Sequence, residues 1–148
     1  MAAADPSINK LSLVIFSGSF DKVHYALAMA AAALAINKPA TLFFTMGAAR
    51  ALMAENRAGA PGWHDLYPTE AGLLPAQADA DLQARNLGGF EELLSACSAL
   101  GASVMVCEMG LKALGLEDTA LRDDIAITPG GLVTFLTDAS AQGTTLFI

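Results

Sequence analysis

The stretch "LSLVIFSGSFDKVHYALAMAAAALAINKPATLFFT", residues 11–45, decides the fold because it holds one complete strand–helix–strand unit. Residues 11–17 form a short apolar run rich in β-forming side chains, which predicts a strand, and "GSFD" after it predicts a tight turn. The Ala-rich segment 21–37 predicts a helix that ends at "NKP", because proline cannot continue a helix. Residues 40–45 predict a second strand.

The next part of the chain is less regular. Segment 46–56, "MGAARALMAEN", has the composition of another helix. Residues 57–82 contain Gly, Pro and aromatic side chains without a sustained period, and we interpret them as an ordered insertion or lid. Trp63 and Tyr67 argue against a solvated linker, because disordered segments are usually poor in aromatic residues.

Strands and helices alternate again after the insertion. The predicted elements are a helix over 89–100, a strand over 102–107, a short helix over 111–114, a strand over 124–128, a helix from Pro129 and a strand over 144–148. This order predicts a single-domain α/β protein, a three-layer α/β/α sandwich around a mainly parallel sheet of about five strands. Ligands of such sheets collect at the carboxyl ends of the strands.

Composition narrows the classes of partner. The 148 residues fit one domain, and 54% of them are hydrophobic while only 16% are charged, so we expect a homo-oligomer that hides apolar surface. The net charge of −7 argues against nucleic acid. The longest apolar stretch, residues 25–36, is shorter than the roughly 20 residues that a membrane span needs. The first residues show no export signal, so we expect a cytoplasmic protein.

The two cysteines have different surroundings in the sequence. Cys97 lies on the apolar stripe of the predicted helix 89–100 and is expected to be a core residue. Cys107 stands where a strand ends and a Gly-containing turn begins, in "SVMVCEMGLKALGL". A helix N-terminus favours a thiolate, so Cys107 is either a core residue near an edge or a thiol displayed for chemistry.

A binding pocket without covalent chemistry is the alternative. "SGSFD" and "TPGG" offer hydroxyls and backbone N–H groups to a small anion or a nucleotide, and Trp63, His64 and Tyr67 would cover them. The same residues serve equally well as turn and capping residues. Two histidines supply too few ligands for a metal, so we expect neither metal nor cofactor. The candidate pocket comprises Ser17, Gly18, Ser19, Phe20, His64, Met109, Gly110, Gly130 and Gly131.

The whole pattern resembles the DsrE/DsrF-like family of small intracellular sulfur-relay and sulfur-oxidation proteins. Four segments carry the resemblance, in this order: "LVIFSGSFDKVHYALAMAAAALA", "ATLFFTMGAARALM", "ASVMVCEMGLKALGL" and "DDIAITPGGLVTFLTDASAQGTTLFI". The third carries most weight, because in such proteins a cysteine after a strand, followed by a short Met/Gly-containing helix, accepts sulfur as a persulfide. Cys107 matches that position, and Cys97 matches no motif cysteine.

The resemblance implies a sulfur carrier or sulfurtransferase that takes sulfur on an exposed Cys107 and passes it to a partner thiol. It also implies sulfur-donor and sulfur-acceptor proteins or small persulfides as partners, and a trimer or hexamer as the assembly. The insertion at residues 57–82 departs from the commoner members. We expect it to cover the cysteine or to bind a partner or ligand.

Overall fold

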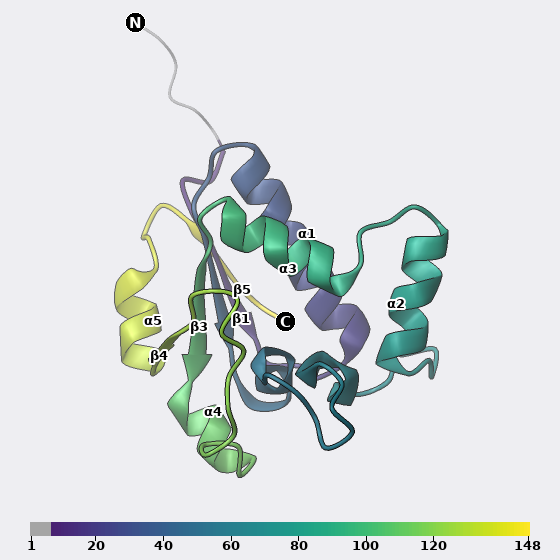
Figure 1. The fold of residues 1–148 in the computed structure, drawn as a ribbon. Helices are drawn as coiled ribbons and strands as arrows, with labels where there is room; N and C mark the ends of the chain where they lie inside the picture. The colour runs from purple at the N-terminus through teal and green to yellow at the C-terminus, as the bar shows by residue number, and fades with distance from the viewer. Residues whose placement is uncertain (1–6) are drawn as a thin grey trace, which may run out of the picture.

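The sheet has five strands, all of them parallel. The computed structural model describes residues 7–148, so residues 1–6, on which the expectation of no export signal partly rests, lie outside it. The sheet has the strand order β4-β3-β2-β1-β5 (Figure 1). The strands are β1 (Leu11–Ile15), β2 (Ala40–Phe44), β3 (Ser103–Cys107), β4 (Thr128–Gly130) and β5 (Thr144–Phe147). The predicted single-domain α/β fold is confirmed.

The first strand–helix–strand unit builds the larger part of the core. Helix α1 (Phe20–Ala35) buries six side chains against the sheet, namely Phe20, Val23, Ala26, Leu27, Ala30 and Ala33. It ends close to the predicted place, because Asn37 takes a left-handed conformation with φ 62° and its N–H donates to the carbonyl of Leu34 at 3.0 Å. Asparagine tolerates that conformation better than most residues, which makes it a good helix terminator.

Side chains alternate between the two faces of the sheet. Helix α3 (Phe90–Ala99) lies beside α1, and the two cover the face that we call the α1 face (Figure 1). Leu13, Ile15, Leu42, Phe44, Val104 and Val106 belong to the core on that face. Their neighbours in the strands point to the opposite face, where Phe43, Met105 and Cys107 form a second, smaller core.

The opposite face, which we call the α5 face, is covered by helix α5 (Leu132–Asp138) (Figure 1). Phe135 is the buried residue of this helix. Leu132, Val133 and Leu136 are exposed. Helices therefore stand on both faces of the sheet, as predicted, but the layer on the α5 face is thin.

The fourth strand differs from the prediction. It spans Thr128–Gly130 rather than residues 124–128, so Pro129 lies inside a strand instead of opening a helix, and α5 begins at Leu132. Proline lacks the N–H that a central strand would need, but β4 is at the edge of the sheet, where one side of the strand has no partner. The predicted start of the helix at Pro129 was wrong for this reason.

The segment between β2 and α3 is more ordered than its sequence indicates. The predicted helix 46–56 is a 3₁₀ helix, η1 (Met46–Leu52), and a second 3₁₀ helix, η2 (Gly62–Asp65), follows it. Helix α2 (Pro75–Ala84), which the sequence analysis missed, ends the predicted insertion and lies on the α1 side of the molecule (Figure 1). Trp63 anchors the segment, since its ring stacks on Phe90 at 5.1 Å and its Nε1 donates to Glu91 at 2.9 Å.

None of the helices within residues 7–148 combines the length and the apolar character that crossing a membrane requires.

Candidate functional site

Cys107 is the last residue of β3, at the carboxyl edge of the sheet, and helix α4 (Glu108–Ala113) begins directly after it. Its sulfur occupies the place of a helix-capping side chain and accepts a hydrogen bond from the backbone N–H of Gly110 at 3.4 Å. The first N–H groups of a helix have no partner within the helix, and a negative charge near them is stabilised. Gly110 supplies one such N–H group to the sulfur of Cys107.

Gly110 is needed for this arrangement. A Cβ atom at Gly110 would lie 2.6 Å from the backbone nitrogen of Met46 and from Oγ1 of Thr45. No side chain fits there, so glycine lets the start of α4 approach the end of β2 closely. The short helix and its capping sulfur are thereby fixed against the neighbouring strand.

The thiol of Cys107 is buried in the single chain, with 1% of the residue exposed. It shares a small apolar cluster with Phe43, Met105 and Phe135, and the rings of the two phenylalanines stack with centroids 4.9 Å apart. The expectation of an exposed sulfur is therefore wrong for the isolated chain. The cover over the thiol is α5, and no residue of the insertion belongs to this cluster.

Cys97 is enclosed more fully. It is 0% exposed in the core of the α1 face, and its thiol donates a hydrogen bond to the carbonyl of Leu27 at 3.4 Å. Burial raises the pKa of the Cys97 thiol to about 11. A thiol in such a position stays protonated and unreactive, which agrees with the prediction of a core residue.

Several predicted site residues do gather around Cys107. Gly130 pairs with Cys107 in the register of β3 and β4, and Gly131 after it is the N-cap of α5. Met109 and Gly110 belong to the first turn of α4, and Met109 is exposed. The third and fourth of the segments that carry the family resemblance therefore meet at one edge of the sheet, as parallel strands require.

The remaining residues of the predicted pocket lie elsewhere. Ser17 and Gly18 line a separate pocket of about 380 Å³, together with Phe16, Met46, Gly47, Tyr67 and Leu114. Phe20 is buried in the core of the α1 face. His64 packs edge-on against Trp63, with centroids 4.2 Å apart, and neither ring lines that pocket. Of the three expected covering residues, only Tyr67 stands over the "SGS" turn.

Two residues that sequence reasoning missed hold the cover in place. Phe135 packs on the cluster of the α5 face, and Asp138 at the end of α5 accepts hydrogen bonds from Lys10 and Thr41, both at 2.7 Å. Burial acts to raise the pKa of Asp138, but the hydrogen bonds from Lys10 and Thr41 and the charge of Lys10 outweigh it, so the pKa lies below its ordinary value. The only sequence signal for this cover was the apolar run "LVTFL", and the run does not indicate which of its side chains faces the sheet.

Metal ligands do not cluster in the part of the chain that the structure describes. Residues 7–148 contain no group of three or more His, Cys, Asp or Glu side chains arranged to hold a metal ion. The chemistry that this edge of the sheet supports is that of a single sulfur atom with a backbone N–H donor.

Comparisons with known proteins agree with this architecture. No protein-family model matches the chain. The uncharacterized protein YrkE of Bacillus subtilis (strain 168) is 27% identical over 165 residues, which cover 94% of this chain and 96% of that protein. The crystal structure of the ychN protein from E. coli superposes with a TM-score of 0.54 at 15% identity, covering 94% of this chain and 99% of that one. The fold is DsrE-like.

Proposed function

We propose that this protein is a sulfur carrier with sulfurtransferase activity, which accepts sulfur as a persulfide on Cys107. The observation that carries the proposal is the place of the sulfur, which caps α4 at the carboxyl edge of a DsrE-like sheet and accepts the N–H of Gly110 at 3.4 Å. An N–H donor at this position stabilises negative charge on the nucleophile and on the persulfide formed from it.

The transfer needs neither metal nor redox partner. The Cys107 thiolate attacks the terminal sulfur of a donor persulfide, R–S–SH. The S–S bond of the donor breaks, a new S–S bond forms on Cys107, and the donor leaves as the thiolate R–S⁻. In the second step an acceptor thiolate attacks the terminal sulfur on Cys107 and regenerates the Cys107 thiolate. Charge, atoms and oxidation state balance in each step.

Access to the thiol requires α5 to move. Phe135 is the buried side chain of this seven-residue helix, so detaching α5 exposes little of the core. Segments with few buried apolar contacts open at a lower free-energy cost than the whole fold does. The donor protein or small persulfide therefore meets Cys107 when the N-terminal end of α5, next to Gly130, lifts away from β3.

The α5 face also carries the apolar surface that an assembly would use. Phe147 is exposed at the edge of this face and packs against Phe16 with centroids 5.3 Å apart. Leu132, Val133 and Leu136 of α5 are exposed on the same face. Large exposed apolar side chains gathered on one face are typical of protein interfaces. We place self-association into a trimer or hexamer here, in the cytoplasm, where thiols remain reduced.

Intact mass spectrometry tests the transfer. The protein is incubated with a low-molecular-weight persulfide, and we expect a mass gain of one sulfur atom that dithiothreitol removes. The gain persists in Cys97→Ser, which serves as the matched control, and is absent from Cys107→Ser. Sulfur that follows Cys97, or no uptake by the native chain, would refute the proposal.

The burial of Cys107 favours a second candidate, a binding module of the same fold without covalent chemistry. Its site would be the pocket of about 380 Å³ at Ser17 and Gly18, with a small anion or nucleotide as the ligand. The same native and Cys107→Ser proteins separate the two. Equal binding of a nucleotide by both proteins, combined with no sulfur uptake by either, would select the binding module.

A further inference from the structure

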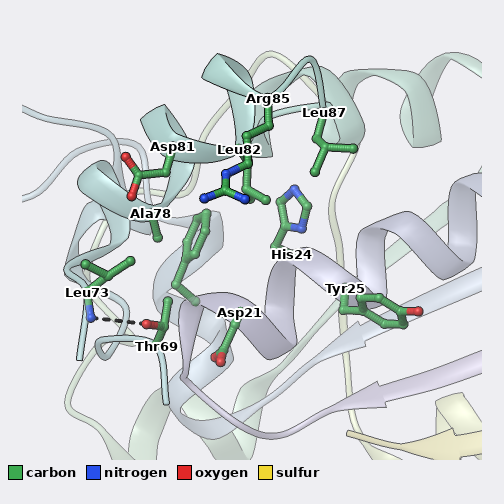
Figure 2. A pocket seen from close by; sticks show the side chains of 11 residues that line it. Asp21, His24, Tyr25, Thr69, Leu73, Ala78, Asp81, Leu82, Arg85 and Leu87 are labelled. Carbon is green, nitrogen blue, oxygen red and sulfur yellow. Dashed lines mark hydrogen bonds between the residues drawn. The ribbon is translucent and has the colours of Figure 1, made fainter. Parts of the chain in front are cut away.

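A second pocket lies on the other side of the sheet from Cys107, between α1 and α2 (Figure 2). Its volume is about 450 Å³, within the range of small-molecule sites. Most of its wall is apolar, formed by Phe20, Tyr25, Leu73, Ala78, Leu82 and Leu87. Tyr25, Leu73 and Leu87 are exposed, and a cluster of large exposed side chains around a hollow is typical of a ligand site.

Four aspartate, histidine and arginine residues line this pocket, and three of them already have partners. A carboxylate oxygen of Asp21 accepts the N–H of Glu70 at 3.1 Å, and Asp81 accepts the side-chain amide of Gln77 at 2.8 Å. The ring of His24 bonds to the carbonyl of Gly88 at 2.8 Å.

Arg85 is the exception. Its guanidinium has no hydrogen bond or ion pair within residues 7–148. Figure 2 shows it over the pocket, between Asp81 and His24. The pocket therefore combines an apolar wall with one unpaired cation at its mouth.

We propose that this pocket binds a small monocarboxylate with an apolar body. The planar guanidinium of Arg85 matches a carboxylate and donates two parallel hydrogen bonds to it. The apolar body would lie against Phe20 and Leu82 and cover the exposed rim. Asp21 and Asp81 also line the pocket, and their negative charges disfavour a second charge on the ligand, so a phosphate dianion fits poorly.

The insertion supplies this site. Helix α2 carries Ala78, Asp81 and Leu82, and Arg85 is its C-cap. The helix is fixed because Asp79 is buried and its carboxylate accepts the N–H of Phe90 at 2.7 Å, which ties α2 to the start of α3. The pocket is thus held between rigid elements, which lowers the entropy cost of binding a ligand.

Calorimetric titration with decanoate and with 2-naphthoate tests the proposal, with decan-1-ol as the uncharged comparison. We expect saturable binding of at least one carboxylate at one site per chain, with amide chemical-shift changes in residues 20–25 and 73–87. Arg85→Gln should weaken binding about tenfold, because it removes one group that forms charge-assisted hydrogen bonds to the ligand. Arg85→Lys, which keeps the charge, should lose less. Lys22→Gln is the matched control, because Lys22 is an exposed cation of α1 that does not line the pocket.

Three results would overturn the proposal: no saturation by either carboxylate below millimolar concentration, decan-1-ol binding as tightly as decanoate, or Arg85→Gln binding as tightly as the native chain. The proposal does not depend on the persulfide chemistry. Cys107→Ser should bind the carboxylate like the native protein, so failure of sulfur uptake and failure of this pocket are separate outcomes.

Discussion

The two faces of the sheet are covered to very different depths. On the α1 face, α1 buries six side chains and is itself packed against α3. On the α5 face, the single buried residue of α5 is Phe135. The same five strands therefore support a thick layer on one side and a thin layer on the other.

The difference explains why two buried cysteines are not equivalent. Cys97 and Cys107 are 0% and 1% exposed, so exposure alone does not separate them. Cys97 is sealed by the thick layer and bonds to a carbonyl, which keeps its proton in place. Cys107 lies under the thin layer, and its sulfur accepts the N–H of Gly110 instead of donating to a carbonyl. Under the proposed function, the two thiols differ in the free energy needed to uncover them.

The largest effect that this comparison predicts is on global stability. Phe90→Ala on the α1 face should lower the free energy of unfolding by about 3–5 kcal/mol, because Phe90 is fully buried and stacks on Trp63. Phe135→Ala should cost clearly less, because α5 can detach while the rest stays folded. Urea unfolding followed by circular dichroism measures both. Equal losses would show that the α5 layer is as integral as the α1 layer.

How far the sequence predicts this architecture depends on the kind of signal. Strands β1, β2 and β3 were located within two residues, because buried parallel strands form distinct apolar runs. The edge strand β5 is only partly buried, and its β-forming residues located it within one residue. The short edge strand β4 was misplaced, since Pro129 is a helix-start signal and equally an edge-strand residue. Helix α2 was missed because its residues are mostly Ala, Gln and Asp, without an apolar stripe.

The sequence predicts where the candidate site lies, but it does not predict that the thiol of Cys107 is buried. The end of β3 follows from the run that stops at Cys107, and parallel pairing brings Gly130 beside it. The enclosure of the thiol depends on which side chain of "LVTFL" turns inward, and four apolar residues in that run fit equally well. Arg85 gave no signal at all, because a single arginine after a polar helix has no pattern to distinguish it.

The second prediction concerns access to the two thiols. Maleimide labelling of the folded protein should modify Cys107 faster than Cys97, and Phe135→Ala should speed the labelling of Cys107 about tenfold or more by removing the side chain that holds α5 down. The rate at Cys97 should be unchanged. Peptide mass mapping at short labelling times assigns each site. Acceleration of both cysteines together would indicate global unfolding rather than opening of α5.

A third prediction tests the α5 face as the surface of self-association. Val133 is 80% exposed, so Val133→Glu should change the stability of the single chain by less than about 0.5 kcal/mol. A charge buried in an interface is costly, so the variant should have a smaller mass by light scattering than the assembly proposed for the native chain. Ile36→Glu, at a residue 61% exposed beyond the end of α1, is the control that should keep the native mass. A monomeric native chain at micromolar concentration would contradict this expectation.

The smallest effect is expected at the far end of α5, where Asp138 ties the helix to Lys10 and Thr41. The carboxylate is 37% exposed, so solvent screening limits its contribution to about 0.5–1 kcal/mol. Because the pKa of Asp138 in the folded chain lies below its ordinary value, this contribution is complete above the ordinary pKa and is lost as the pH falls through the lower, folded value. Asp138→Asn should therefore reduce the hydrogen-exchange protection of α5 a few-fold at pH 7, and the difference from the native chain should shrink towards pH 3.

Comparing the two proteins at each pH cancels the intrinsic dependence of exchange on pH. Asp123→Asn, at an exposed carboxylate outside α5, should match the native chain throughout. A difference between the Asp138→Asn variant and the native chain that stays constant down to pH 3 would mean that shape rather than charge ties α5 to the sheet.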